Sequence, residues 1–294
     1  MNSSYSTAPM RNLIASIAAA TLFIGCGSTT HWPETVRTPD GAALRFEVQG
    51  EGEPTLVFVH GWSCHRQFWN EQIKRFQQVR RVVALDLMGH GESDAQRTDW
   101  TIEAFGDDVV RVCDALQLER VILVGHSMGG PVCLVAAKRL GARCLAVVGV
   151  DTLRDVEHRI PPERIEPFLA PFRADFAAAT NTFVREQFFP KDADPALVDL
   201  VAGSMSARSP EIALPMIEAL MRFDEGAALA AVDVPVHCIQ SESGMYPTNL
   251  AGNQARNPHY TFVVMPGVGH FPMLEDPERF ARLLADFVRP LGDG

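Results

Sequence analysis

One serine of this sequence has the surroundings that nucleophilic chemistry requires. Ser127 is the centre of a Gly-His-Ser-Met-Gly segment at 125–129, which follows an apolar run at 121–124 and precedes a helix-compatible segment. A G-x-S-x-G pattern between a strand and a helix places its serine on a sharp turn at the carboxyl edge of a sheet. The free N–H groups at the start of the helix favour negative charge that develops beside them. The pattern therefore predicts Ser127 as a nucleophile; the alternative is a serine in an ordinary tight turn.

A histidine near the end of the chain is placed to supply the base that such a serine needs. A hydroxyl attacks poorly at neutral pH unless a base removes its proton, and histidine suits this role because its ordinary pKa lies near the working pH. His270 lies in a Gly-His-Phe-Pro segment at 269–272, directly after the last strand that the sequence predicts. We expect His270 to be the base. The other histidines are expected to be structural or exposed, with His60 and His90 bracing their loops by hydrogen bonds.

Four segments, in this order, resemble the α/β-hydrolase superfamily. They are His-Gly-Trp at 60–62 after a buried strand, Asp-Leu-Met-Gly-His-Gly-Glu-Ser at 86–93, the segment around Ser127 and the segment around His270. The resemblance extends over nearly the whole chain from about Glu34 onward. It implies a mainly parallel, doubly wound sheet flanked by helices, which is the α/β-hydrolase fold.

The same resemblance assigns the groups that would stabilise the oxyanion of an attacked carbonyl. Preorganised N–H donors aimed at the developing charge typically contribute about 3 kcal/mol each to transition-state stabilisation. The family's donors correspond to the backbone N–H of Met128, directly after the nucleophile, and of Trp62 in the first of these segments. For Trp62, a side chain that walls the pocket is a second interpretation, and the two roles are compatible.

The acid that would orient the histidine departs from the family's commoner pattern. In this superfamily the acid lies between the serine and the histidine in the chain, and its commoner position is in the loop after the strand at 236–239. That position falls at about Gly244, which has no side chain. Some family members carry the acid after the preceding strand, where this chain has Asp151. We therefore expect Asp151 to be the acid. The alternatives are Glu242, Asp155 or a dyad without an acid; Asp151 would then have only a structural role, as a helix N-cap.

Strand and helix patterns alternate along most of the chain, which indicates a parallel sheet covered on both faces. The alternation assigns 34–151 and 233–294 to a hydrolase core that is interrupted at 152–232. The predicted strands are at 34–38, 43–48, 55–59, 81–85, 121–124, 144–150, 234–239 and 260–265. The predicted core helices are at 67–77, 102–116, 128–140 and 277–288, the last with Asp276 as its N-cap.

The interrupting segment at 152–232 is expected to be a helical lid over the active edge. It has no strong strand pattern, and its prolines are expected to mark helix boundaries, because proline suits a first turn and breaks a helix interior. Its phenylalanines and methionines are expected either to line an apolar slot or to fasten the helices to the core. Four arginines near its start are expected on an exposed charged face: Arg154, Arg159, Arg164 and Arg173.

Composition and residue types exclude several functions. The chain of 294 residues carries a formal net charge of −10 without a basic stripe, which argues against nucleic acid as a partner. A serine in the turn disfavours haloalkane dehalogenase and epoxide hydrolase activity, because relatives resembling those enzymes use an aspartate there. The histidines lack metal-ligand spacing, so neither a metal nor a cofactor is expected. The cysteines other than Cys26 are expected to be buried thiols, with one disulfide as the alternative.

The first residues are expected to be a signal rather than a part of the fold. Arg11 precedes an apolar stretch, and Phe-Ile-Gly-Cys at 23–26 resembles a bacterial lipobox, with phenylalanine where leucine is usual. We expect residues 1–25 to be a lipoprotein signal peptide, Cys26 to be lipidated and 26–33 to be a tether. The expected location is the periplasmic face of the outer membrane, with an ordinary secretory signal as the alternative.

Together these residues predict a lipid-anchored serine hydrolase. It is expected to cleave a small to medium carboxylic ester through an acyl-enzyme intermediate, with Ser127 as nucleophile, His270 as base and Asp151 orienting the base. A lactonase and a cofactor-free haloperoxidase-like perhydrolase use the same machinery and are the alternatives within the family. A non-catalytic binding module of the cell envelope is the alternative from another class.

Overall fold

Eight strands form one sheet in the computed structural model, which describes Met1 and residues 34–39, 41–244 and 246–292. The order is β1-β2-β4-β3-β5-β6-β7-β8; β2 pairs antiparallel with both β1 and β4, and the remaining pairs are parallel. The strands are β1 Thr35–Arg37, β2 Ala43–Gln49, β3 Thr55–Val59, β4 Val82–Leu85, β5 Val121–His126, β6 Cys144–Val150, β7 Val236–Ser241 and β8 Tyr260–Met265. The predicted doubly wound, mainly parallel sheet is confirmed.

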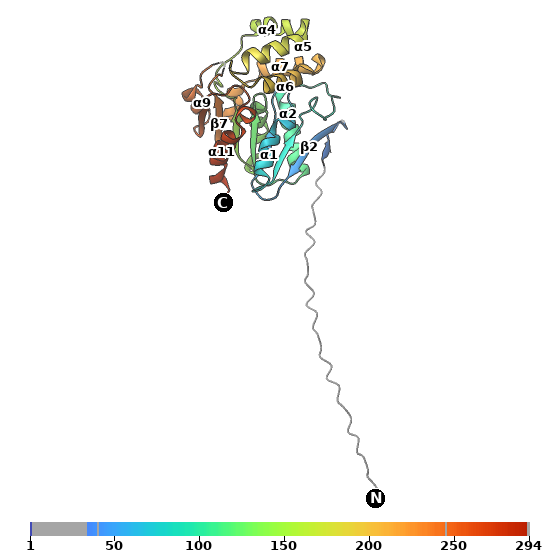
Figure 1. Cartoon of the computed structure of the whole chain (residues 1–294). Coiled ribbons are helices and arrows are strands. Elements are labelled where there is room, and N and C mark those ends of the chain that lie inside the picture. The colour runs from blue at the N-terminus through green and yellow to red at the C-terminus, as the bar shows by residue number, and fades with distance from the viewer. Residues whose placement is uncertain (2–33, 40, 245, 293–294) are drawn as a thin grey trace. The chain divides into compact units, whose positions relative to one another are not determined.

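The central strands are buried on both faces, as their continuous apolar runs predict. Every residue of β3, β4 and β5 is buried. The core helices are α1 Asn70–Phe76, α2 Ile102–Ala115, α3 Gly129–Leu140, α9 Leu250–Arg256, α10 Pro272–Glu275 and α11 Pro277–Val288, with short 3-10 helices η1 Arg66–Trp69, η2 Gly141–Arg143 and η3 Arg289–Leu291. They cover the sheet in separate groups, α1 packing with α10 and α11, and α2 packing with α3 (Figure 1). This cover is what a parallel sheet with two apolar faces needs.

A local sequence signal accounts for the start of helix α11. Helix α11 has the predicted bounds, and the Asp276 side chain caps it by accepting a hydrogen bond from Arg279 N at 3.0 Å. The helix predicted at 67–77 is instead divided into η1 and α1. Helices α9 and α10 are absent from the prediction, because so few residues show only a weak periodic pattern.

Residues 152–232 contain helices and no strand, as predicted. The helices are α4 Pro162–Ala174, α5 Phe176–Gln187, α6 Pro195–Ser206, α7 Pro210–Arg222 and α8 Glu225–Ala230. This helical insertion (residues 152–232) connects β6 to β7, and α4 to α7 form a layer across one end of the sheet (Figure 1).

Prolines begin α4, α6 and α7, but the expectation that all prolines of the insertion mark boundaries is wrong. Pro167 and Pro171 lie inside α4, and Pro215 lies inside α7. An interior proline removes a backbone hydrogen bond and costs a helix about 3 kcal/mol. Both helices bury apolar side chains, among them Leu169 and Met216, and this burial offsets the cost.

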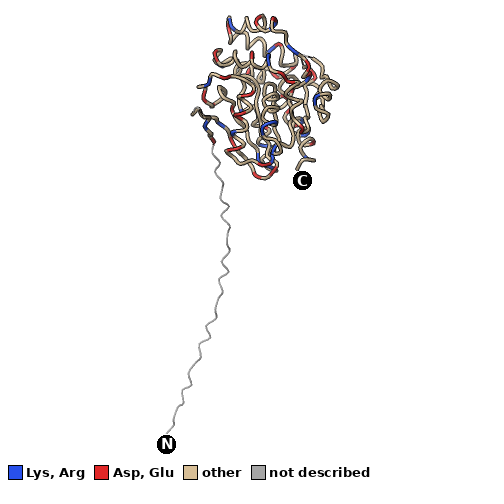
Figure 2. Tube along the Cα trace, turned by 180° about the vertical axis from the view of Figure 1, so that it is seen from behind, with Lys and Arg blue, Asp and Glu red and all other residues tan. Residues whose placement is uncertain are grey.

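The surface of the described part shows no concentration of positive charge. Acidic and basic residues are interspersed along the Cα trace (Figure 2). Within the described ranges, no helix is long and apolar enough to cross a membrane. Apart from Met1, the residues predicted as a signal peptide, as the lipidation site Cys26 and as a tether lie outside the described residues.

The cysteines of the described part are all free and buried, as expected. Burial raises the pKa of the Cys113 and Cys144 thiols to about 12, so both are protonated at neutral pH. In the residues that the structure describes, no three His, Cys, Asp or Glu side chains form a group that could hold a metal ion.

Candidate active site

Ser127 lies on a sharp turn between β5 and α3. Its φ is 52°, in the left-handed region that residues with a side chain rarely adopt. Two glycines allow this turn. A Cβ at Gly125 would lie 2.2 Å from the carbonyl oxygen of Gly129, and a Cβ at Gly129 would lie 2.5 Å from that of Val59. The G-x-S-x-G pattern thus reflects backbones that approach more closely than side chains permit, and Ser127 lines a pocket.

His270 and Asp151 meet at the same edge of the sheet. Asp151 directly follows β6, and its Oδ2 lies 2.6 Å from His270 Nδ1. The carboxyl side chain is 4% exposed. Burial alone would raise its pKa, but the contacts with His270 and Arg154 outweigh burial and hold the pKa well below its ordinary value. Because an ionised carboxylate only accepts hydrogen bonds, His270 donates through Nδ1, which leaves its Nε2 free to accept a proton.

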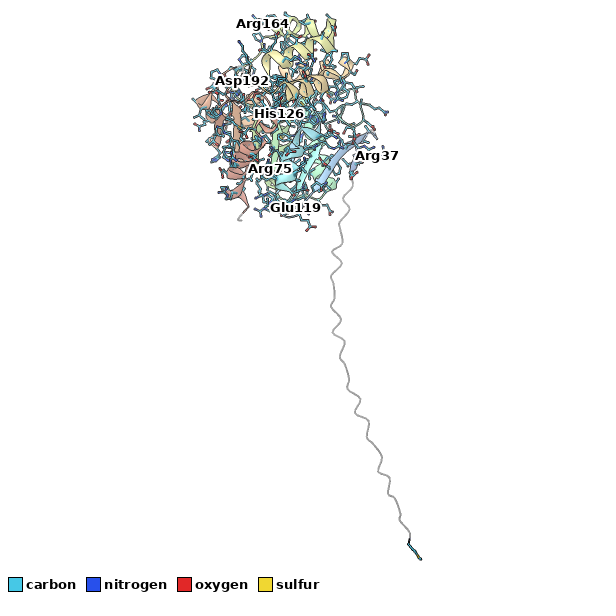
Figure 3. All side chains as sticks on the ribbon, in the orientation of Figure 1. Arg37, Arg75, Glu119, His126, Arg164 and Asp192 are labelled. Atoms are coloured by element: carbon cyan, nitrogen blue, oxygen red, sulfur yellow. The ribbon has the colours of Figure 1, made fainter. Side chains whose placement is uncertain are left out.

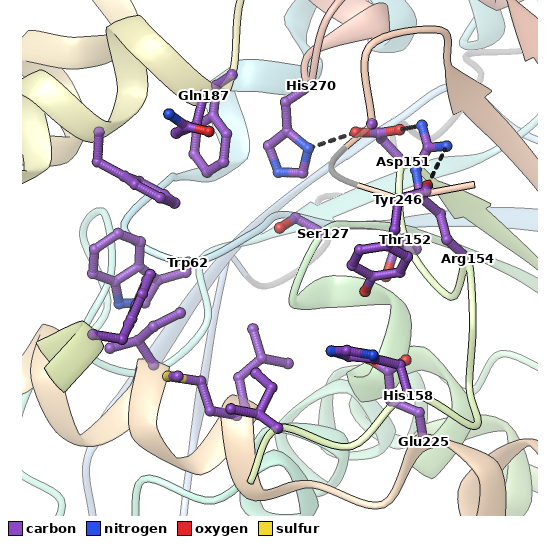
Figure 4. A pocket seen from close by; sticks show the side chains of 18 of the residues that line it. Trp62, Ser127, Asp151, Thr152, Arg154, His158, Gln187, Glu225, Tyr246 and His270 are labelled. Carbon is purple, nitrogen blue, oxygen red and sulfur yellow. Dashed lines mark hydrogen bonds and ion pairs between the residues drawn. The ribbon is translucent and has the colours of Figure 1, made fainter. Parts of the chain in front are cut away.

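These three side chains line one pocket. Figure 4 shows the His270 ring between the Asp151 carboxylate and Ser127. They come from three separate loops, which follow β5, β6 and β8. Parallel strands end at a common edge of the sheet, so residues far apart in the chain meet there.

The first N–H donor implied by the resemblance lies in a loop that also contacts the helical insertion. Trp62 Nε1 donates to the carbonyl of Ala213 in α7 at 2.8 Å, so the indole joins the core to the insertion. The backbone N–H groups of Trp62 and Met128 donate no hydrogen bond to any described residue. Both N–H groups are therefore unpaired, and the Trp62 side chain also walls the pocket.

Two buried histidines hold the Trp62 loop in place, as the sequence predicts. His60 Nε2 accepts a hydrogen bond from Leu87 N at 3.0 Å, and His90 Nε2 accepts one from Ser63 N at 3.2 Å. Each of the two loops, at 60–63 and 86–93, therefore contributes one histidine that accepts a hydrogen bond from the backbone of the other loop. Burial lowers the pKa of His60 to about 4 and also lowers that of His90, so both rings are neutral.

The two alternative acids, Glu242 and Asp155, contact residues other than His270. Glu242 is exposed, and its carboxylate accepts a hydrogen bond from Gly267 N at 3.0 Å. The Asp155 carboxylate accepts from Asn249 Nδ2 at 2.9 Å. Among the described residues, Asp151 is the one carboxylate in contact with the His270 imidazole.

A comparison with protein families decides the family of this chain. The model of the alpha/beta hydrolase family matches residues 56–283. The chain belongs to the α/β-hydrolase family. The match includes all four segments on which the resemblance depends.

Several known proteins are similar to this hydrolase. A dihydrolipoyllysine-residue acetyltransferase component of the acetoin cleaving system from Pseudomonas putida is 28% identical over 271 residues, which cover 85% of this chain and 67% of that protein. A pimeloyl-(acyl-carrier protein) methyl ester esterase from Pectobacterium atrosepticum is 25% identical and covers 84% of this chain and 99% of that protein. A solved structure of an N-acyl homoserine lactone degrading enzyme has a TM-score of 0.74 and 26% identity, covering 86% of this chain and 100% of that chain.

In this hydrolase, the expectation that Arg154 lies on an exposed face is wrong. Its side chain is 10% exposed and donates to Asp151 Oδ1 at 2.5 Å and to Ser241 O at 2.6 Å. The guanidinium fills the space beside Gly244, where a Cβ would lie 2.0 Å from Arg154 Cζ. The glycine at the commoner acid position thus makes room for a cation that holds the carboxylate. The other three arginines are exposed as expected, and Figure 3 shows Arg164 at the outer end of the insertion.

His126, directly before the serine, has a role that the sequence pattern does not identify. It lies in the interior of the hydrolase (Figure 3), and its Nε2 donates to the carbonyl oxygen of His270 at 2.7 Å. Burial lowers the pKa of His126 to about 3, so the ring stays neutral beside His270. His126 therefore holds the backbone of the His270 loop without adding a charge.

The pocket of the hydrolase has a volume of about 810 Å³ and lies between the core and the helical insertion. Five phenylalanines of the insertion line it: Phe168, Phe172, Phe183, Phe188 and Phe223. Phe188 stacks on the His270 imidazole, with ring centroids 4.2 Å apart. Phe176 and Phe189 are buried without lining the pocket, and they pack on Trp62 and Phe271 of the core. Some of these aromatic residues therefore form an apolar slot, and others fasten the insertion to the core.

Proposed function

We propose that this α/β hydrolase cleaves a small to medium carboxylic ester through an acyl-enzyme intermediate. The observation that carries the proposal is the contact of the buried Asp151 carboxylate with His270 Nδ1, beside a serine on a left-handed turn. The relative named as a methyl ester esterase supports an ester substrate. The phenylalanines that line the pocket support a substrate with an apolar arm.

In the first step, Ser127 Oγ attacks the ester carbonyl carbon while His270 Nε2 takes the hydroxyl proton. Asp151 keeps the imidazole oriented through the Nδ1 hydrogen bond and stabilises the imidazolium that forms. The carbonyl oxygen becomes an oxyanion, and the N–H groups of Trp62 and Met128 stabilise it by about 3 kcal/mol each. His270 then gives the proton to the alcohol oxygen as the ester C–O bond breaks, which leaves the acyl group on Ser127.

In the second step, a water molecule takes the place of the departed alcohol. His270 removes one proton from the water as its oxygen attacks the acyl carbonyl, and the same N–H groups stabilise the second oxyanion. The bond to Ser127 Oγ then breaks, and His270 returns the proton to the serine. The products are a carboxylic acid, an alcohol and the regenerated enzyme.

A fluorophosphonate probe tests the proposed nucleophile. An activated serine attacks the phosphorus and displaces fluoride, so we expect about one equivalent of probe on the Ser127 peptide by mass spectrometry. Ser127→Ala is expected to remain unlabelled. Ser243→Ala removes another serine that lines the pocket and is expected to leave labelling intact. A folded wild-type protein that takes up no probe would contradict the proposal and support the non-catalytic binding module.

A lactone is the second candidate substrate class. The solved structure of an N-acyl homoserine lactone degrading enzyme, with a TM-score of 0.74, favours it. A lactone is an internal ester, so the same groups act on it and the leaving oxygen stays attached to the acyl chain. Comparison of kcat/KM for a lactone and for the methyl ester of the corresponding hydroxy acid separates the two classes.

We also propose that Cys26 carries a lipid that anchors the hydrolase to the periplasmic face of the outer membrane. The support is the Phe-Ile-Gly-Cys segment at 23–26 after an apolar stretch. The full chain, expressed in a bacterium with an outer membrane, is expected to incorporate radioactive palmitate and to sediment with that membrane. Cys26→Ala is expected to lose the label, whereas Ser127→Ala is expected to keep it. Label that persists in Cys26→Ala, or that is absent from the wild-type chain, would refute the anchor.

A further inference from the structure

The pocket has a polar end as well as an apolar one. Figure 4 shows the Trp62 indole on one side of Ser127. On the other side lie His158, Glu225 and Tyr246, which form the polar end of the pocket. A substrate whose carbonyl lies at Ser127 therefore extends its two arms into different surroundings.

The Glu225 carboxylate faces the pocket without a partner in the described part of the chain. Its neighbour Asp224 caps α8, accepting a hydrogen bond from Ala227 N at 2.8 Å. Arg159 favours the ionised form of Glu225, but its guanidinium is already paired with Asp224 and also donates to Val156 O at 2.6 Å. No described side chain therefore supplies Glu225 with a counter-ion in direct contact.

Burial makes the charge on Glu225 costly. Burial raises the pKa of this carboxyl to about 7, although the positive charge of Arg159 lowers it. The charged and titratable groups around Glu225 are Asp155, His158, Arg159, Cys238 and Tyr246. Glu225 is partly buried, and a partly desolvated carboxylate without a described partner is stabilised by a ligand that brings a positive charge. The chemical complement of Glu225 is therefore a cation.

An aromatic ring lies beside this carboxylate. Tyr246 stacks on His158, with ring centroids 5.2 Å apart and an interplanar angle of 28°. Burial, with a contribution from the charge of Glu225, raises the pKa of Tyr246 to about 12, so the phenol stays neutral. Aromatic faces attract cations, and Tyr246 is 36% exposed, so a ligand can reach it. A carboxylate beside an aromatic face is suited to an ammonium group.

We propose that the polar end of the pocket binds a cationic group of the substrate. The preferred substrate is then an ester or lactone that carries an ammonium group on one arm and an apolar group on the other. This inference rests on the proposed serine hydrolase, which fixes the carbonyl at Ser127. Glu225 acts in it as a specificity residue and takes no part in bond making.

Two pairs of isosteric esters test this specificity. In the first pair, choline butyrate has a quaternary nitrogen on the alcohol arm where neohexyl butyrate has a quaternary carbon. In the second pair, ethyl trimethylammonio-butyrate is compared with the ethyl ester in which a tert-butyl group replaces the trimethylammonium group on the acyl arm. We expect the wild-type enzyme to prefer the cationic ester in one pair by about tenfold in kcat/KM. Glu225→Gln is expected to abolish this preference by lowering kcat/KM for the cationic ester. Glu186→Gln, an exposed carboxylate change in α5, is the matched control and is expected to keep the preference.

The preference for the cationic ester is expected to increase with pH. Glu225 is neutral below its pKa of about 7 and charged above it, so the ratio of kcat/KM for cationic over uncharged ester rises as pH increases through this value. Both esters need the same His270, and both substrates have a fixed charge, so the ionisation of His270 cancels in the ratio. In Glu225→Gln the ratio is expected to be independent of pH.

Calorimetry with choline alone separates this inference from the proposed hydrolysis. In Ser127→Ala, choline is expected to bind, and the Glu225→Gln change in that background is expected to weaken binding by about tenfold. If the wild-type enzyme hydrolyses no ester but choline still binds, the proposed function is overturned and the cation site is not. Ester turnover with equal ratios in wild type and Glu225→Gln would overturn the cation site, as would a wild-type preference for anionic esters.

Discussion

Replacement of Ser127 by alanine is expected to lower kcat for p-nitrophenyl butyrate by about 10⁵-fold. Without Oγ no acyl-enzyme forms, so His270 has no hydroxyl to activate. The N–H groups of Trp62 and Met128 belong to the backbone and remain in place, so residual catalysis above the uncatalysed rate and a nearly unchanged KM are expected. Steady-state release of nitrophenolate measures kcat and KM, and pre-steady-state traces with excess substrate detect an acyl-enzyme burst in the wild type.

The fold of this variant is expected to survive. Alanine and serine have the same Cβ, so the left-handed φ of 52° at this position is no more strained in the variant. Circular dichroism and a thermal melt check this, and Ser243→Ala provides the matched loss of a hydroxyl from the pocket wall. Residual activity above about 1% of wild type in a pure preparation would place the nucleophile at another residue.

The parts of this site that one continuous segment specifies could be predicted from the sequence. The turn at Ser127 requires two glycines at fixed distances along the chain, so its geometry leaves a local pattern. The bracing by His60 and His90 was also predictable, because His60 directly follows the buried strand β3 and His90 lies in the loop after the buried strand β4. The strands themselves followed from apolar runs, since a parallel sheet buries both faces.

Features that depend on neighbouring strands could not be predicted in this way. Arg154 is only three residues from Asp151, but its side chain is buried because β7 lies beside β6 and supplies Ser241 O, and because Gly244 leaves a space in the loop after β7. Its charge suggested an exposed side chain, and only the three-dimensional neighbourhood reverses that expectation. The partner of His126 and the unpaired carboxylate of Glu225 are likewise properties of the packed insertion and core. Packing also explains the prolines inside α4 and α7, where burial overrides the local preference.

Replacement of Asp151 by asparagine is expected to lower kcat/KM for p-nitrophenyl butyrate by about 10³- to 10⁴-fold. The asparagine amide is nearly isosteric, but it cannot hold the His270 imidazole with a negative charge or stabilise the imidazolium that forms during attack. It also leaves Arg154 without its carboxylate, so a fall of several degrees in Tm is expected, and rates are to be compared well below the melting transition.

Glu242→Gln is the matched control, because it makes the same chemical change at the commoner acid loop. The Glu242 carboxylate is exposed and contacts Gly267 N rather than His270, so this variant is expected to stay within about twofold of wild type. A large loss in Glu242→Gln together with a small one in Asp151→Asn would move the acid to the loop after β7. Equal, small losses in both variants would mean that His270 works without a carboxylate. The charge-assisted contact of 2.6 Å between Asp151 and His270 argues against both of these results, because it already fixes the tautomer that a base at Ser127 needs.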